Sequence, residues 1–147
     1  MATATETNTL NSLLRGEMSA IETYRQAIDK LGGDPHDPWI EELRAIQRDH
    51  RDAADALWHH VEQHGGKPST DSGPWGAFAK AVEGTAKLFG NAAALKALKE
   101  GEEHGLKDYE EALKDQTLPA DCQAMINGIL PRQRAHITTL DGLMARI

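Results

Sequence analysis

The chain has 147 residues, of which 27% are charged and 39% are hydrophobic, and its mean hydropathy is −0.55. This composition is typical of one folded domain and excludes a disordered or membrane-embedded chain. The formal net charge is −7 and no basic cluster stands out, which argues against a nucleic-acid partner.

No apolar run approaches the length that spans a bilayer, and residues 1–9 lack the basic and apolar regions of a secretory signal. We therefore expect no membrane partner and a cytoplasmic location. Cys122 is the only cysteine, so the sequence has no intrachain disulfide and no cysteine-based metal motif.

A first helix is predicted from near residues 8–9 to Leu31, after a threonine-rich stretch, residues 1–8, that we expect to fray. Its inward-facing stripe alternates spacings of four and three residues, the pattern of helices packed in a bundle. The stripe consists of Leu10, Leu14, Glu17, Ile21, Tyr24, Ile28 and Leu31. Two of its members, Glu17 and Tyr24, are polar at positions where a buried side chain is expected.

A second helix is predicted to begin at Pro38, with Asp37 as its cap, and to end at residues 65–66. Its stripe has the same alternating spacing. The members are Ile40, Leu43, Gln47, His50, Ala54, Leu57, Val61 and His64. The polar members Gln47 and His50 fall near the middle of this helix.

Residues 65–91 form a long connection in which residues 75–89 read as a shorter helix, and Asn91 can cap the helix that follows. Such a connection is long enough to travel back along the bundle. We therefore predict one all-α domain over residues 1–147, an up-down four-helix bundle with one long crossover.

The third helix is predicted over residues 92–115, and the short loop at 116–120 makes the fourth helix antiparallel to it. The stripe of the third helix is Leu95, Leu98, Glu102, Leu106, Tyr109 and Leu113. The stripe of the fourth is Cys122, Ile126, Ile129, Gln133, His136, Leu140, Leu143 and Ile147. Pro131 should bend the fourth helix just before Gln133.

The two halves of the chain repeat one plan: a Gly-Glu pair, a tyrosine seven residues after the glutamate, and a Gln-x-x-His in the next long helix. A helix rises about 1.5 Å per residue, so the polar residues of each hairpin should lie roughly 20 Å along the bundle from the loop of that hairpin. The polar side chains expected in this common layer are Glu17, Gln47, His50, Glu102, Gln133 and His136.

Buried carboxylates without partners are costly, so this layer needs compensation. One solution is a divalent metal ion held by the glutamates and histidines. The other is a pair of Glu–His hydrogen bonds closed by the glutamines. Because helical side chains lean toward the N-terminus, we also predict that Tyr24 bonds Glu102 and that Tyr109 bonds Glu17, each fixing the orientation of a carboxylate.

This order of residues resembles the ferritin-like superfamily, which includes bacterioferritins and rubrerythrins, and within it small bacterial ferritin-like domains of unknown function. The resemblance implies Glu17, His50, Glu102 and His136 as ligands of Fe, Mn or Zn, and a role in iron handling or oxidative-stress defence. In that family the positions of Gln47 and Gln133 hold glutamates that bridge two irons. Glutamine is a poor bridge between hard cations, so here the two are expected to be weak ligands or hydrogen-bond partners, which argues against full di-iron oxidase chemistry and leaves enzymatic activity open.

A different interpretation of the whole chain is a non-catalytic bundle that acts structurally or through protein partners, with the ancestral metal site replaced by a Glu-His-Gln hydrogen-bond network. Away from the layer, His59, His60 and His64 with Asp55 or Glu62 resemble a surface metal cluster. Neighbouring histidines at a helix end, however, more often bind no metal.

Several further residues lie beside the stripes. Glu100, Glu103 and His104 are off the stripe and are expected in solvent. Asp49 is either a partner of the polar layer or a solvent-facing charge. Trp58 is expected at the edge of the bundle, where an exposed aromatic side chain would favour a homodimer.

Overall fold

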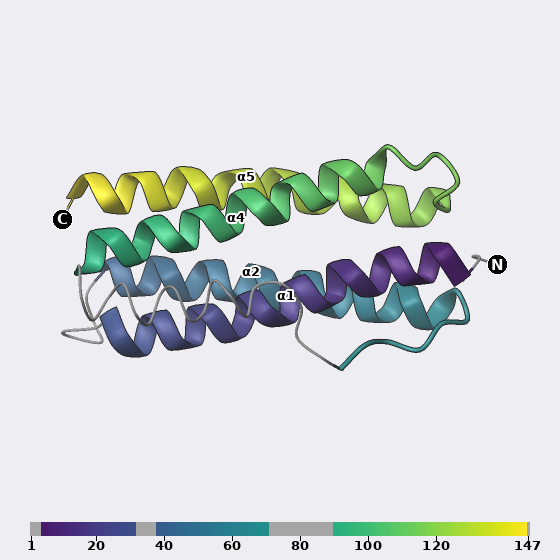
Figure 1. The fold of residues 1–147 in the computed structure, drawn as a ribbon, viewed down its shortest axis with the longest axis horizontal. Helices are drawn as coiled ribbons and strands as arrows, with labels where there is room; N and C mark the ends of the chain where they lie inside the picture. Colours follow the sequence, from purple (N-terminus) through teal and green to yellow (C-terminus); the bar gives the residue numbers. More distant parts are fainter. Residues whose placement is uncertain (1–3, 32–37, 71–89, 147) are drawn as a thin grey trace.

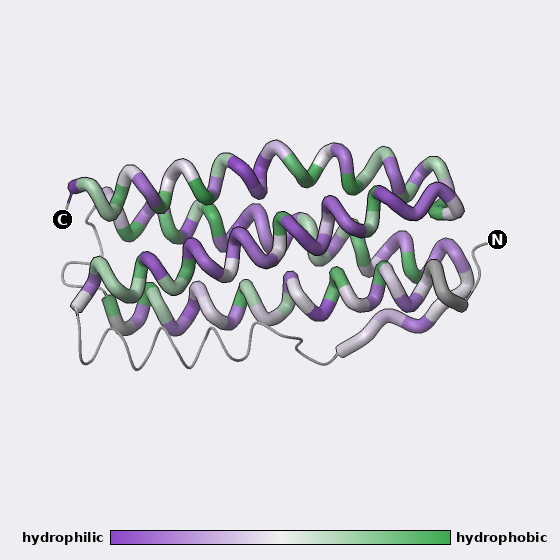
Figure 2. Tube along the Cα trace, turned by 45° about the horizontal axis from the view of Figure 1, so that its top comes forward, coloured by the Kyte–Doolittle hydropathy of each residue, from purple (hydrophilic) through white to green (hydrophobic). Residues whose placement is uncertain are grey.

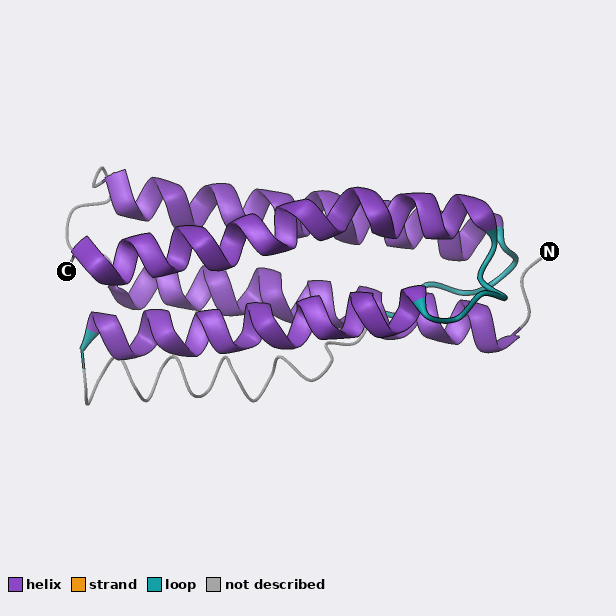
Figure 3. Ribbon diagram, turned by 90° about the horizontal axis from the view of Figure 1, so that it is seen from above, coloured by secondary structure: helices purple, strands orange, loops and turns teal. Residues whose placement is uncertain are grey.

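The structure is a computed structural model that describes residues 4–31, 38–70 and 90–146. Four helices make up this part of the chain, and it contains no strand (Figure 3). They are α1 (Ala4–Leu31), α2 (Pro38–Gln63), α4 (Asn91–Leu113) and α5 (Ala120–Arg146). The predicted all-α four-helix bundle is confirmed.

Each helix packs against two neighbours: α1 contacts α2 and α4, and α5 contacts α4 and α2. The pairs α1 and α5, and α2 and α4, therefore lie on the diagonals of the bundle. Figure 1 shows that α2 ends at the end of the bundle that holds the N-terminus, whereas α4 begins at the opposite end. The connection between them has to cross the length of the bundle, as the predicted topology requires.

Most residues of the predicted stripes are buried. The exceptions among the apolar members are half-buried: Ile21, Ile28, Leu106, Leu113 and Ile129. Ile147 lies outside the described residues. Buried apolar side chains form two clusters, one toward each end of the bundle, and the polar stripe residues lie between them. In Figure 2 apolar and polar segments alternate along every helix, because only one face of each is turned inward. The buried residues that separate the two clusters are Glu17, Gln47, His50, Glu102, Gln133 and His136.

α1 begins at Ala4, earlier than the start expected at residues 8–9, so part of the stretch expected to fray is helical. The reason is a tertiary contact. Thr7 is buried, and a Cβ built on Gly66 would lie 2.9 Å from the Thr7 Cβ and Cγ2 atoms. The first turns of α1 are therefore covered by the loop that follows α2.

Pro38 is the first residue of α2, as predicted. Asn91, by contrast, is the first residue of α4 rather than its cap: the cap position is Gly90, with a φ of 86° and no side-chain hydrogen bond. The expected cap Asp37 and the expected helix at 75–89 lie outside the described residues. None of the described helices combines the length and apolar character needed to cross a bilayer.

The end of α2 is a Schellman turn. The N–H of Gly66 donates to the carbonyl of Val61 at 2.9 Å, and the N–H of Gly65 donates to that of Glu62 at 3.1 Å. Gly65 has a φ of 81°, which a residue with a Cβ adopts only at a cost. The turn directs the chain back across Thr7.

Two glycine-to-alanine substitutions should have opposite effects on stability. In Gly66→Ala the new Cβ meets Thr7 at 2.9 Å and Val61 at 3.0 Å, so we expect a loss of about 1–3 kcal/mol in the free energy of unfolding. In Gly128→Ala, an exposed position of α5 with no atom within 4 Å, we expect a gain of about 0.5–1 kcal/mol. Urea denaturation measures both, and a Gly66→Ala protein as stable as the Gly128→Ala control would contradict the close approach.

Candidate metal centre

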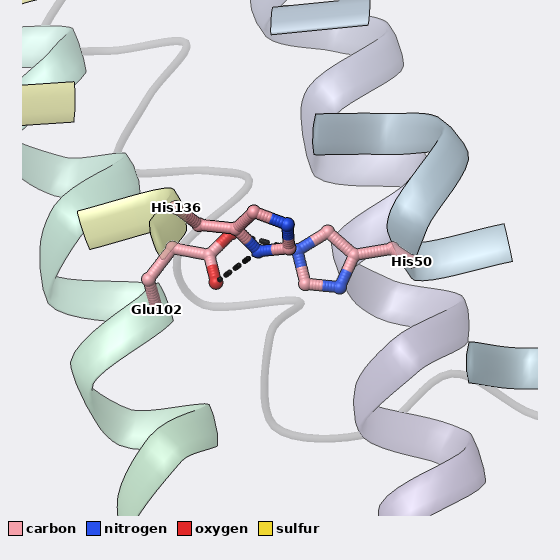
Figure 4. Close-up of side chains that lie close together, drawn as sticks. All are labelled: His50, Glu102 and His136. Carbon is pink, nitrogen blue, oxygen red and sulfur yellow. Dashed lines mark hydrogen bonds and ion pairs between the residues drawn. The ribbon is translucent and has the colours of Figure 1, made fainter. Parts of the chain in front are cut away.

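Glu102 of α4 lies at the centre of the polar layer and is fully buried. Its Oε1 accepts from the Tyr24 hydroxyl at 2.6 Å and lies 2.6 Å from His50 Nε2. Its Oε2 accepts from Gln133 Nε2 at 2.6 Å and lies 3.3 Å from His136 Nδ1. One carboxylate therefore contacts side chains from the other three helices, and Figure 4 shows the two imidazoles reaching it from α2 and α5.

Glu17 of α1 is the second buried carboxylate. Its Oε1 accepts from the Tyr109 hydroxyl at 2.5 Å, and its Oε2 lies 2.5 Å from His50 Nδ1. His50 thus places one ring nitrogen against each carboxylate. The two tyrosine hydrogen bonds expected from the sequence, Tyr24 to Glu102 and Tyr109 to Glu17, are confirmed.

His136 is fixed from its other side by Asp49 of α2, whose Oδ2 lies 2.8 Å from His136 Nε2. Of the two roles expected for Asp49, the structure shows the contact with the polar layer. The His50 and His136 rings have centroids 4.9 Å apart. Each imidazole therefore has one nitrogen toward Glu102 and the other against a different carboxylate, Glu17 or Asp49.

The two glutamines occupy different surroundings. The Gln133 amide donates to the Glu102 carboxylate and, at 3.0 Å, to the Glu102 backbone carbonyl. The Gln47 amide instead donates to the backbone carbonyl of Ile21 at 3.0 Å, so the structure does not bring it to Glu102. The Glu102 carboxylate and the two backbone carbonyls can only accept hydrogen bonds, so both glutamines contact them through their NH₂ groups.

His50, Glu102 and His136 form a buried group whose ligand atoms all lie within 4.8 Å of one another. Two imidazoles and a carboxylate are a donor set that suits Fe, Mn or Zn. The carboxylate behind each imidazole fits this use, since metal-binding histidines usually donate their second N–H to such a partner, which orients the ring. The residues present therefore fit a metal ion, with Glu17 and Asp49 as the orienting carboxylates.

Charge and burial perturb the pKa values of this group. Burial raises the pKa of Glu102, but the charge of His50 and hydrogen bonds from His136 and His50 outweigh it and lower the pKa from 4.5 to about 2. Burial lowers the pKa of His50, but Glu102 and Glu17 raise it well above 6.5. Without metal, the two carboxylates therefore favour the protonated form of the His50 ring.

The tyrosines remain donors at all ordinary pH values. Burial and the adjacent carboxylates raise the pKa values of Tyr24 and Tyr109 well above 10. Each hydroxyl can therefore only supply its proton to a carboxylate hydrogen bond.

A narrow space of about 10 Å³ reaches the centre beside Glu17 and His50. Its walls include Gly16 and Gly105, where two facing helices have no side chain. It shares Asp108 with a larger acidic groove of about 430 Å³ on the surface. The other titratable residues lining that groove are His104, Glu111 and Asp115. The acidic groove therefore adjoins the space beside Glu17.

A protein-family model described as a domain of unknown function (DUF2383) matches residues 5–115. This span includes Glu17, His50 and Glu102, and it ends before α5, which carries His136. No curated protein matches the chain.

Removing either tyrosine hydroxyl should destabilise the metal-free protein. A hydrogen bond to a charged acceptor contributes about 1.5–3 kcal/mol, so Tyr109→Phe and Tyr24→Phe should each lower the free energy of unfolding by about that amount. The aromatic rings are retained, which isolates the loss of the bond to Glu17 or Glu102. The measurement is urea denaturation in the presence of a chelator, and wild-type stability in both variants would refute the buried hydrogen bonds.

The stability of the metal-free protein should fall on both sides of a mildly acidic optimum. Since the pKa of Glu102 is lowered from 4.5 to about 2, its contribution is complete above pH 4.5 and is lost as the pH falls toward 2. Since the pKa of His50 is raised well above 6.5, its contribution is complete below pH 6.5 and is lost as the pH rises through the folded-state pKa.

Urea denaturation with chelator over a pH series measures this dependence. We expect His50→Gln to lose the decline above pH 6.5, whereas His59→Gln, which alters an exposed side chain, should keep it. A wild-type free energy of unfolding that rises steadily above pH 6.5 would contradict the raised pKa of His50.

Proposed function

The chain belongs to the DUF2383 family, and we propose that this member binds one divalent metal ion, Fe, Mn or Zn, at the centre of its helical bundle. The observation that carries the proposal is the buried convergence of His50, Glu102 and His136, with ligand atoms within 4.8 Å of one another. The carboxylate behind each imidazole supports it, because such partners are typical of metal-binding histidines.

The proposed ligands are His50 Nε2, His136 Nδ1 and the Glu102 carboxylate. Glu17 acts in this proposal through His50, by accepting the Nδ1 proton at 2.5 Å so that the Nε2 lone pair is available. Asp49 does the same for His136 at 2.8 Å. The direct contact between Glu17 and the ion that the sequence suggested is not needed for this set.

The glutamines favour one ion rather than a bridged pair. Gln133 donates a hydrogen bond to the oxygen of Glu102 nearest His136, which a glutamate at this position could not do. Gln47 is occupied with the Ile21 carbonyl. Both positions that hold bridging carboxylates in ferritin-like proteins therefore supply donors here.

The resemblance to ferritin-like proteins supports iron among the three metals and a role in iron handling or oxidative-stress defence. Bound iron or manganese would supply one-electron chemistry, and zinc would supply Lewis acidity. The residues of the chain hold the ligands in a nearly closed layer, with the acidic groove as the approach.

A second candidate function rests on the same geometry. His50 already has a carboxylate oxygen within 2.6 Å of each ring nitrogen, so a proton can satisfy the two glutamates without metal. In that case the centre is a structural hydrogen-bond network, and the protein acts through its surfaces.

Metal analysis of matched variants separates the two candidates. Glu102 and Glu103 are neighbours on α4, one buried and one exposed, so Glu102→Gln and Glu103→Gln make the same chemical change inside and outside the centre. After loading with Fe(II), Mn(II) or Zn(II), we expect elemental analysis to find one equivalent more in wild type and Glu103→Gln than in Glu102→Gln.

Thermal unfolding gives an independent measure. Metal at 100 times its dissociation constant stabilises the folded state by about 2.7 kcal/mol, which is about 5–10 °C in Tm for a chain of this size. We expect the Tm increase of Glu103→Gln on metal addition to exceed that of Glu102→Gln by this amount. Equal metal content and equal Tm shifts in the two variants would reject the metal centre, and a large loss of metal-free stability in Glu102→Gln would then identify the structural network.

A further inference from the structure

A second group of metal-binding side chains lies where the end of α2 meets the start of α5. His60 is in the last turn of α2 and His64 directly follows the end of that helix, and Asp121 and Cys122 are in the first turn of α5. Both helix ends lie at the end of the bundle that holds the N-terminus (Figure 1). His60 is about 15 Å along α2 from His50, so this group is separate from the proposed centre.

The donor atoms of this group converge. His64 Nε2 lies 2.8 Å from Asp121 Oδ2, and His60 Nε2 lies 3.7 Å from the same oxygen. The ligand atoms of His64, Asp121 and Cys122 all lie within 4.8 Å of one another. In a tetrahedral zinc site, with bonds of about 2.0–2.3 Å, neighbouring donors are about 3.3–3.7 Å apart. His60 contacts Asp121 but is not within 4.8 Å of all three other donors, so its ring has to shift to complete a four-ligand geometry.

His60 is oriented for ligation. Its Nδ1 lies 2.9 Å from the backbone carbonyl of Ala56, which can only accept, so Nδ1 carries the proton. In the neutral ring, Nε2 then presents a lone pair toward Asp121 Oδ2, which also has only lone pairs to offer. At 3.7 Å this lone pair faces the oxygen that His64 Nε2 contacts at 2.8 Å, and a cation bound among the three atoms would take the place of that contact.

The backbone holds the remaining donors in place. His64 sits at the C-cap of α2, immediately before the Schellman turn at Gly65 and Gly66, and its side chain is 15% exposed. Cys122 is fully buried. The Asp121 side chain is 49% exposed and leaves a route for an ion from solvent. Ligands in this group thus come from both hairpins of the bundle.

We propose that His60, His64, Asp121 and Cys122 form a site for a divalent transition-metal ion of the zinc class. Two imidazoles, a carboxylate and a thiolate are a closed four-ligand set for zinc, which would keep the Cys122 sulfur deprotonated. The site cross-links α2 to α5 and stabilises the folded chain. This site differs from the surface cluster suggested by the sequence, because it does not include His59. The His59 side chain is 72% exposed, and its Nδ1 lies 3.8 Å from Glu62 Oε1.

Cobalt(II) is the probe for this site because its complexes with thiolates have a charge-transfer absorption in the near ultraviolet. Cys122 is the only cysteine, so that band cannot arise from the centre around Glu102. We expect full-length wild type to show the band on titration with Co(II), with an intensity that corresponds to one thiolate-bound ion, and zinc to abolish it. The same metal should protect Cys122 from alkylation under mildly denaturing conditions.

The matched variants are His64→Gln and His59→Gln, which make one change inside and one outside the group at the same helix end. Because loss of an orienting partner alone weakens metal binding about 10–100-fold, loss of the His64 ligand should weaken Co(II) binding at this site by at least about 100-fold. His59→Gln should leave it unchanged, and circular dichroism confirms that both variants fold.

Asp121→Asn, on an exposed side chain, should weaken binding in the same way as His64→Gln. The proposal is overturned if wild type gives no charge-transfer band, or if His64→Gln binds Co(II) as tightly as His59→Gln. If one equivalent of Co(II) binds in a way that depends on His64 but gives no charge-transfer band, Cys122 is not a ligand and the four-ligand site is overturned. None of these results depends on whether the Glu102 centre binds metal.

Discussion

The placement of His50 between two buried carboxylates is the constraint on which the rest of the bundle depends. Glu17 and Glu102 come from different hairpins, and each costs several kcal/mol to bury without a partner. His50 reaches both, at 2.5 and 2.6 Å, while each carboxylate also takes the hydroxyl of the tyrosine from the opposite hairpin. A slip of one turn in either hairpin would break these bonds together, so the polar layer fixes the register of apolar clusters that would otherwise tolerate sliding.

The two halves of the sequence repeat one plan, but the site that they build is not symmetric. In the first half the residue before the histidine is Asp49, and in the second it is Ala135. Asp49 contacts the histidine of the other half, His136, whereas the carboxylate that contacts His50 from behind is Glu17. This exchange gives each imidazole one carboxylate behind it and directs both toward Glu102, which is why the donor set converges on a single carboxylate.

Much of this could be predicted from the sequence because helical periodicity decides which side chains face inward. The stripes were phased correctly, and the lean of helical side chains was sufficient to predict the bonds of Tyr24 and Tyr109. What periodicity cannot supply is how the helices are rotated and placed against one another, both within a hairpin and between the two hairpins. The Ile21 carbonyl as acceptor for Gln47, the burial of Thr7 against Gly66, and the proximity of His64 to Asp121 are all contacts between distant segments.

The interface between α2 and α5 shows why these non-local contacts matter. Charged or polar pairs connect the two helix segments along their length: Glu42 with Arg146, Asp49 with His136 at 2.8 Å, Asp52 with Arg132 at 3.9 Å, and Asp121 with His64 at 2.8 Å and with His60 at 3.7 Å. The Asp52–Arg132 pair is exposed, and such pairs contribute about 0–1 kcal/mol. The pairs of His136 with Asp49 and of His64 with Asp121 each include a largely buried histidine, and each of these histidines lies in a group of side chains that could hold a metal ion. These two histidine contacts therefore join the second helix of one hairpin to the second helix of the other, at an edge where an exposed ion pair contributes little.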